Sequence, residues 1–103
     1  MLLGVASMAA PPAQAAGRFR EFAIPTRDSD PFGIAAGPDG NVWFTESIRN
    51  KIGRITTSGV ITEFVVPSLN SELDGIAAGP DGNLWFAESA RNQIGRASCR
   101  ERV

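Results

Sequence analysis

Two short groups of charged and polar residues recur 42 positions apart and are the best candidates for chemistry. Each group combines a glutamate, an arginine and an asparagine: Glu46, Arg49 and Asn50 in the first, and Glu88, Arg91 and Asn92 in the second. Carboxylate oxygens are ligands that Mg²⁺ accepts, so glutamates from successive repeats could hold a divalent cation. We therefore predict that these six residues line a ligand-binding surface, although the sequence does not identify which of them would be metal ligands.

The same two groups also have a purely structural interpretation, in which no ligand is bound. Glu46 could form an ion pair with Arg49 within one loop, as Glu88 could with Arg91, or the carboxylates could cap backbone amides. Perturbed and paired carboxylates are often structural. The sequence favours this structural interpretation, and ligand binding is the functional hypothesis beside it.

The composition of the 103-residue chain narrows the functional classes. The chain is 43% hydrophobic and 20% charged, which is typical of a single globular domain. Its formal net charge of −1 gives no attraction to nucleic acid or to an anionic membrane, so neither is expected as a partner. Cys99 is the only cysteine, which excludes an intrachain disulfide and a cysteine metal cluster. The chain has no histidine, the most common general acid or base near neutral pH.

The first 15 residues differ from the rest and resemble an export signal. Residues 2–10 are apolar or small, in a run too short to span a bilayer. Ala13-Gln14-Ala15 matches the small-x-small pattern that signal peptidase cleaves. We therefore expect a signal-peptide-like leader at 1–15 and an exported protein, periplasmic or extracellular. The alternative is a disordered, alanine-rich leader with no targeting role.

A 42-residue repeat organises the remainder of the chain. The segment GIAAGPDGNVWFTESIRNKIGR at 33–54 returns as GIAAGPDGNLWFAESARNQIGR at 75–96. The motif Glu-Phe-x-x-Pro also occurs twice at this spacing, at 21–25 and 63–67. A period in the low forties suits a four-stranded propeller blade or a helical pair, so local chemistry must separate the two.

Local chemistry favours four short strands in each repeat. Runs of β-forming residues separated by turn residues occur at 33–36, 41–46, 51–57 and 61–66. In the turn at 37–40, proline presets φ, aspartate suits the third position and glycine the left-handed fourth. We therefore interpret Asp39 and its repeat Asp81 as turn formers. The sequence predicts an all-β fold of β-propeller blades, each blade being a four-stranded antiparallel sheet.

The apolar residues of the second strand predict how the blades pack. Val42-Trp43-Phe44 lacks the polar alternation of a half-exposed strand, as expected when both faces of a sheet are buried. We expect the rings of Trp43 and Trp85 to lie between blades as apolar anchors, and not in a cofactor site.

The sequences GPDGNVWFTE and NKIGRITTSGVITEF resemble the repeat of the virginiamycin B lyases, also called streptogramin lyases. The resemblance covers residues 18–96 and implies a seven-bladed propeller, of which this chain is an N-terminal fragment of about two blades. It further implies a carbon–oxygen lyase that opens streptogramin B cyclic depsipeptides at the ester by elimination. In that family magnesium is the cofactor and a histidine moves the proton.

The residues present limit what the resemblance implies for this chain. The metal and histidine positions of the family correspond to later blades, so no catalytic residue carries over. We expect the chain alone to be inactive and to bind no magnesium. In a full-length protein, a small-molecule or peptide ligand would bind at the mouth of the channel. The alternative function is an exported, non-catalytic propeller that serves as a binding or scaffold module.

The repeat region has an incomplete blade at each end. We expect an unpaired outer strand at 18–25, a whole blade at 33–67 and a partial blade at 75–96. Uncovered blade edges would allow self-association. Residues 97–103 break the pattern, and their back-translation resembles a widely used sequencing adapter. We interpret them as a non-native tail, with a natural divergent end as the alternative, and Cys99 within it has no predicted role.

Overall fold

The structure is a computed structural model that describes residues 18–99. The expected leader at 1–15 and the last four residues of the expected tail lie outside the described residues. Within the described part, the regular elements are strands, apart from a single turn of 3-10 helix, η1 (Ser89–Arg91). No helix among these residues has the length and apolar character that a membrane span requires.

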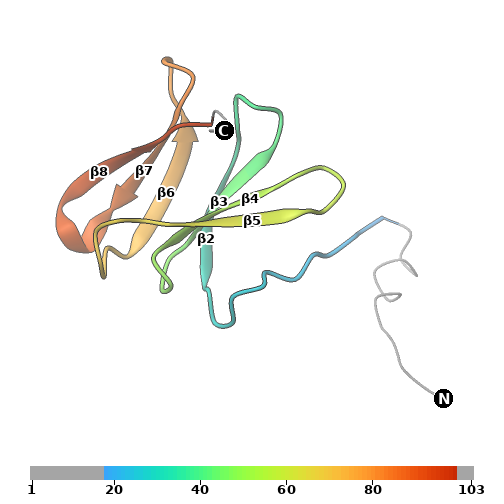
Figure 1. Cartoon of the computed structure of the whole chain (residues 1–103), viewed down its shortest axis with the longest axis horizontal. Coiled ribbons are helices and arrows are strands. Elements are labelled where there is room, and N and C mark those ends of the chain that lie inside the picture. Colours follow the sequence, from blue (N-terminus) through green and yellow to red (C-terminus); the bar gives the residue numbers. More distant parts are fainter. Residues whose placement is uncertain (1–17, 100–103) are drawn as a thin grey trace.

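The strands form two antiparallel sheets that follow the 42-residue repeat (Figure 1). The first sheet, blade 1, has the order β2 (Pro31–Ala36), β3 (Val42–Glu46), β4 (Lys51–Ile55) and β5 (Ile61–Val65). The second sheet, blade 2, has the order β6 (Leu73–Ala78), β7 (Leu84–Glu88) and β8 (Gln93–Ala97). This arrangement confirms the all-β fold and the antiparallel strands predicted from the spacing of turns.

The two ends of the described region differ in part from the expectation. Residues 18–25, predicted as an unpaired outer strand, pair with no described strand and are not themselves a strand, and Figure 1 shows this segment, in blue, leaving blade 1 on the side away from blade 2. At the other end, β8 includes Ala97, which the sequence pattern assigned to the tail. Ala97 pairs with Leu84 as Ile55 pairs with Val42, so the blade continues one residue further than expected.

The turns at the two Pro-Asp-Gly sites have the predicted geometry. The amide of Gly40 donates to the carbonyl of Gly37 at 3.2 Å, and Gly40 has a φ of 84°. Gly82 repeats both features, with a 3.2 Å bond to Gly79 and a φ of 79°. Glycine adopts this left-handed conformation without the steric penalty of a side chain. The turn chemistry read from the sequence is therefore confirmed in both blades.

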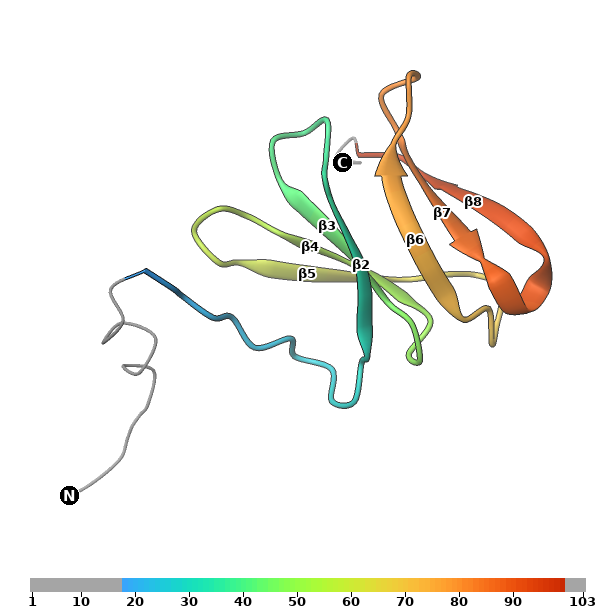
Figure 2. The same cartoon turned by 180° about the vertical axis from the view of Figure 1, so that it is seen from behind.

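The blades pack face to face, with their inner strands β2 and β6 side by side (Figure 2). The buried core between them consists of Trp43, Ile52 and Val66 from blade 1 and Leu73, Leu84 and Phe86 from blade 2. Trp43 is 2% exposed, whereas its repeat Trp85 is 37% exposed, because a described blade covers only Trp43. The interblade position predicted for Trp43 is confirmed, and Trp85 lies on the open face of blade 2.

Thr45 connects the two inner strands by hydrogen bonds. Its Oγ1 accepts from the amide of Gly33 and donates to the carbonyl of Asp74, both at 2.9 Å. The strands lie so close here that a Cβ on Gly33 would be 2.9 Å from the same carbonyl oxygen, so only glycine fits without a backbone shift. The repeat of Thr45 is Ala87, which faces the open side of blade 2. The threonine hydroxyl therefore occurs in blade 1, where a carbonyl of blade 2 accepts its hydrogen bond, and is replaced by alanine on the open face of blade 2.

Candidate functional site

Glu46, the first of the predicted site residues, ends β3 and is completely buried, with 0% exposure. Successive side chains of a strand point to opposite faces, so Glu46 shares a face with Phe44, and Trp43 points to the other face. Trp43 faces blade 2, and Glu46 therefore faces the segment 26–30 that enters blade 1. Neither carboxylate oxygen of Glu46 has a hydrogen-bond donor among the described groups. An isolated ionised carboxylate would be strongly disfavoured in this position.

The surroundings of Glu46 contain a second carboxyl group and one ammonium group, those of Glu63 and Lys51. Thr26 Oγ1 donates to Glu63 Oε1 at 2.9 Å and accepts from Lys51 Nζ at 2.8 Å. Lys51 Nζ also lies 3.9 Å from Glu63 Oε1. The second oxygen of Glu63 is buried without a donor. Two carboxyl groups thus share one compensating positive charge in a partly buried site.

One proton held by the two carboxyl groups accounts for this arrangement. Burial, followed by the hydrogen bond and the charge of Glu63, raises the pKa of Glu46 to about 7. Burial also acts to raise the pKa of Glu63, but bonds from Glu46 and Thr26 and the charge of Lys51 outweigh it and hold that pKa below its ordinary value. Protonated Glu46 then donates to Glu63 and supplies the donor that two ionised carboxylates lack. The pair titrates as one unit.

Glu88 is the repeat of Glu46 and is also buried, but it has a different partner. Its Oε1 accepts from Ser71 Oγ at 3.0 Å, and Ser71 holds the position that Ser29 has in blade 1. Gln93 stands where blade 1 has Lys51. Both glutamates therefore point beneath the loop that enters their own blade, and neither presents its carboxylate at the surface.

The ion pair predicted between Glu46 and Arg49 is not formed. Arg49 Nε donates to the carbonyl of Arg27 at 3.0 Å, and its guanidinium lies 3.7 Å from the carboxylate of Asp28. The prediction was wrong because Glu46 points into the sheet face, whereas Arg49 lies in the exposed turn that follows. The predicted pair of the second repeat fails in the same way, since the buried carboxylate of Glu88 bonds to a serine.

Asn50 anchors the loop that enters blade 2. Its backbone is left-handed, with a φ of 59°. Its Nδ2 donates to the carbonyls of Val66 at 2.9 Å and Ser68 at 2.7 Å, and its Oδ1 accepts from the amide of Ser71 at 3.1 Å. Asn92 has the same left-handed backbone, with a φ of 56°, but no described loop follows blade 2. A ligand-binding role for the six predicted residues stays a prediction.

Asp39 does more than form its turn, which the sequence analysis missed. Its Oδ1 accepts from Trp43 Nε1 at 3.0 Å and from the amide of Asn41 at 3.1 Å, and Asn41 Nδ2 donates to Oδ2 at 3.0 Å. The guanidinium of Arg54 lies 4.0 Å from Oδ2 and 5.6 Å from the centre of the Trp43 ring. The same network recurs among Asp81, Asn83, Trp85 and Arg96. The sequence contained a sign of this network, because its aspartate, asparagine, tryptophan and arginine have identical spacing in both repeats.

The described residues do not form a site that fits Mg²⁺. That ion prefers near-octahedral coordination by oxygen ligands. Between residues 18 and 99, no three histidine, cysteine or acidic side chains gather where they could hold a metal ion. Glu46 and Glu63 are two interacting carboxyl groups, and Lys51 Nζ lies 3.9 Å from Glu63 Oε1.

Antiparallel sheets of this kind, stacked face to face with their inner strands adjacent, are the blades of a β-propeller, and the fold defines the chain as a member of that class. More specifically, the chain belongs to the virginiamycin B lyase family, whose model matches residues 12–103.

Solved and curated relatives agree with this assignment. A catalytically inactive variant of virginiamycin B lyase from Staphylococcus aureus, crystallised with quinupristin, matches with a TM-score of 0.71 and 43% identity over 84% of this chain and 33% of that chain. A streptogramin B lyase structure matches with a TM-score of 0.65 and 36% identity over 81% of this chain and 31% of that chain. Virginiamycin B lyase of Bacillus licheniformis is 51% identical over 44 residues, which are 43% of this chain and 15% of that protein. The chain thus spans about a third of the length of the solved relatives.

Proposed function

We propose that this chain supplies two scaffold blades to a propeller that opens streptogramin B antibiotics at their ester bond by elimination. The observation that carries the proposal is the match of the described region, at 43% identity, to a virginiamycin B lyase crystallised with quinupristin. A second solved relative, a streptogramin B lyase, supports the same class of substrate.

Elimination differs from hydrolysis in its balance of atoms. A base removes a proton from the carbon next to the one that bears the ester oxygen, and the released electron pair forms a carbon–carbon double bond. The bond between the ester oxygen and its alkyl carbon breaks, and the carboxylate leaves with the electron pair of that carbon–oxygen bond. No water is consumed, so the linear product is an isomer of the cyclic substrate.

In this proposal the described residues build the scaffold, and the proton-transfer groups lie elsewhere in the propeller. The chain contains no histidine, and its buried glutamates and turn aspartates are engaged within the blades. The inactive Staphylococcus aureus variant has a histidine replaced by alanine, which supports placing the proton-transfer group outside these two blades. Magnesium is likewise proposed to bind outside residues 18–99, where no fitting ligand set gathers.

An assay of the purified chain with quinupristin and Mg²⁺ tests the scaffold role. We expect no linear product, while wild-type Staphylococcus aureus enzyme in the same buffer converts the substrate completely. Liquid chromatography with mass spectrometry separates the isomeric product of elimination from a hydrolysis product, which is heavier by one water. Linear isomer formed by the chain alone would show that it contains the proton-transfer group and would overturn the scaffold assignment.

A further inference from the structure

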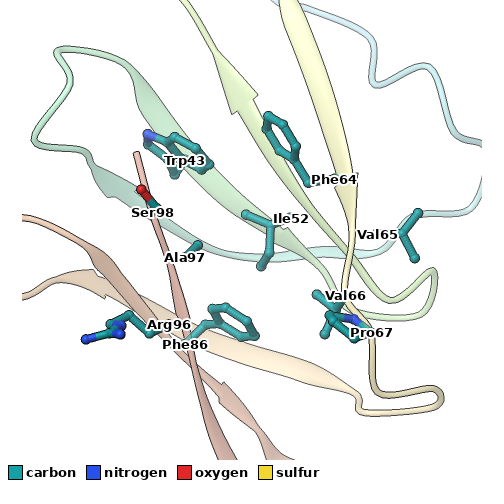
Figure 3. Close-up of a pocket in the computed structure, with 10 residues that line it drawn as sticks. All are labelled: Trp43, Ile52, Phe64, Val65, Val66, Pro67, Phe86, Arg96, Ala97 and Ser98. Atoms are coloured by element: carbon teal, nitrogen blue, oxygen red, sulfur yellow. The ribbon is translucent and has the colours of Figure 1, made fainter. Parts of the chain in front are cut away.

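Strand register places three charged side chains on one face of blade 1. Glu46 on β3 pairs with Lys51 on β4. Glu63 on β5 pairs with Gly53, which lies two residues along β4 from that lysine. Residues that pair across antiparallel strands, and residues two apart along a strand, project from the same face. Trp43 projects from the other face, where it lines the hollow of about 200 Å³ between the blades (Figure 3). The charged cluster therefore lies on the side of blade 1 that points away from blade 2.

Segment 26–30 covers this cluster and is bonded to it from within. The hydroxyl of Thr26 donates to the carboxylate on β5 and accepts from the ammonium group on β4. Ser29 is 4% exposed and lies beside Glu46, but its hydroxyl donates to the carbonyl of Thr26. Both oxygens of Glu46 are thus left without a described donor beneath the segment. Closure of the segment depends on how the proton and the charges of this cluster are arranged.

The turn after β3 holds the outer side of the same segment. The amides of Ser47 and Ile48 donate to two of its carbonyls, at 3.2 Å and 3.3 Å. Both bonds are longer than the roughly 2.9 Å that is typical of amide hydrogen bonds in proteins. The other charged side chains of the segment and of this turn are exposed, so water and salt screen them. They are Arg27, Asp28, Asp30 and Arg49.

The loop that joins the blades has the same backbone bonds above a different carboxyl group. The amides of Ser89 and Ala90 donate to two carbonyls of that loop, at 3.2 Å and 2.9 Å. Beneath the loop, Glu88 accepts a hydrogen bond from Ser71 Oγ at 3.0 Å, so its carboxylate has a donor. This loop is therefore a matched comparison for segment 26–30 within the same chain.

We propose that segment 26–30 is a pH-controlled latch, closed over blade 1 while Glu46 and Glu63 share one proton and opened, with the blades still folded, when that proton is lost. Opening carries Thr26 and Ser29 away from the end of β3, so that water reaches both carboxylates. Lys51 then remains beside Glu63. The device lies within residues 26–63 and needs no lyase activity.

Linkage between protonation and closure gives the direction of the switch. In the closed state burial, followed by the hydrogen bond and charge of Glu63, raises the pKa of Glu46 to about 7. In the open state water solvates the carboxyl group, and its pKa returns toward the ordinary value of 4.5. The closed state therefore holds the extra proton between these values, and closure weakens as the pH rises. The lowered pKa of Glu63 acts in the opposite sense, but its contribution is lost only as the pH falls below its ordinary value.

Two variants and a control isolate the shared proton. Glu46→Gln keeps a neutral donor toward Glu63 but does not titrate, so the latch should stay closed at all pH values. Glu63→Gln removes the neighbouring negative charge, which should lower the pKa of Glu46 and reduce the effect of pH on opening. Asp30→Asn is the control, because Asp30 is exposed and asparagine tolerates its left-handed backbone, with a φ of 54°.

Amide hydrogen exchange of the full chain tests the latch, followed by NMR at about pH 5 and about pH 8 and corrected for intrinsic exchange rates. The protection of Ser47 and Ile48 is compared with that of Ser89 and Ala90, which report on the matched loop. From the lower to the higher pH we expect this relative protection to fall about tenfold or more in the wild type and in the aspartate control. Glu46→Gln should show no relative fall, and Glu63→Gln a smaller one.

Three outcomes would overturn the proposal. A parallel fall at both pairs of amides would show that pH acts on the whole chain and not on the segment. A relative fall as large as that of the wild type in either glutamine variant would show that the shared proton is not the cause. Ser47 and Ile48 that exchange as fast as a free peptide at the lower pH would show that the segment is never closed.

Discussion

The most unusual residues of blade 1 are Glu46 and Glu63, two carboxyl groups in one partly buried cluster with a single lysine for compensation. Two interacting carboxyl groups do not both ionise readily, so the pair retains one proton below about pH 7. Protonated Glu46 donates a hydrogen bond to Glu63, and only one of the two groups then carries a negative charge. The cluster therefore holds segment 26–30 on blade 1 most firmly when the two carboxyl groups bind a single proton.

The free energy of unfolding should fall as the pH rises from about 4.5 to about 7. Glu46 keeps its proton to about pH 7 when folded but releases it near 4.5 when unfolded, so across this interval the folded state holds the extra proton and loses stability as pH rises. The contribution of Glu63 has the opposite sign, being present above its ordinary pKa and lost as pH falls through its lowered one. We expect a fall on the order of 2 kcal/mol, measured by urea unfolding at about pH 5 and about pH 8.

Glu46→Gln provides the control for this pH dependence. Glutamine keeps a neutral donor toward Glu63 but does not titrate. The difference between the unfolding free energies at the two pH values should shrink to near zero in this variant. A pH dependence equal to that of the wild type would show that other groups cause it and would contradict the shared proton.

The two aspartate networks provide a matched pair of variants. Asp39→Ala removes the acceptor of the buried Trp43 indole, whereas Asp81→Ala removes that of Trp85, which water can reach. Both variants lose the same turn contacts, so the difference between their free energies of unfolding reports the effect of burying the indole. We expect Asp39→Ala to lower the free energy of unfolding by about 1–3 kcal/mol and Asp81→Ala by less, as measured by urea unfolding. Equal losses would contradict a distinct role for the buried indole.

At the scale of elements, the glycine in β4 determines how closely the aromatic ring of β3 can approach. A Cβ on Gly53 would lie 2.2 Å from the ring of Phe44, and one on Gly95 would lie 2.3 Å from the ring of Phe86. The registers explain the contact, because Phe44 pairs with Gly53 and Phe86 pairs with Gly95. A glycine inside a strand often marks such a close approach.

Gly53→Ala should therefore lower the free energy of unfolding by about 1–3 kcal/mol, because the ring of Phe44 must move from its position. The matched background is Phe44→Leu, which removes the ring and leaves room for the new methyl group. In a double-mutant cycle measured by urea unfolding, Gly53→Ala should have a smaller effect in the Phe44→Leu background. The same effect in both backgrounds would show that the ring contact is not the cause.

The strands were predictable because local signals mark their ends. The Pro-Asp-Gly turns and the 42-residue repeat place β2 to β8 to within two residues. The burial of Glu46 was not predictable, because it depends on segment 26–30 folding over the end of β3. The contact of Asp39 with Trp43 escaped notice for another reason: the turn alone was a sufficient explanation of the aspartate.

At the scale of the whole molecule, the two blades behave as one packed unit. Trp43 lies in the core between them, and Thr45 joins β2 to β6 by hydrogen bonds. The loop joining the blades is fixed by the side chain of Asn50. These interactions lie within residues 31–97, so the pair of blades should be transferable to a related propeller without loss of its internal packing.

The most direct test of the account is a chimera of the Staphylococcus aureus enzyme. Its two blades that match residues 31–97 are replaced by those residues, and the conversion of quinupristin to the linear isomer is measured. If the blades of this chain are lyase scaffold, the chimera should keep kcat/KM within about tenfold of the parent enzyme, a change of ~1.4 kcal/mol or less. A chimera that folds with the parent's circular dichroism and produces no linear isomer would contradict the account.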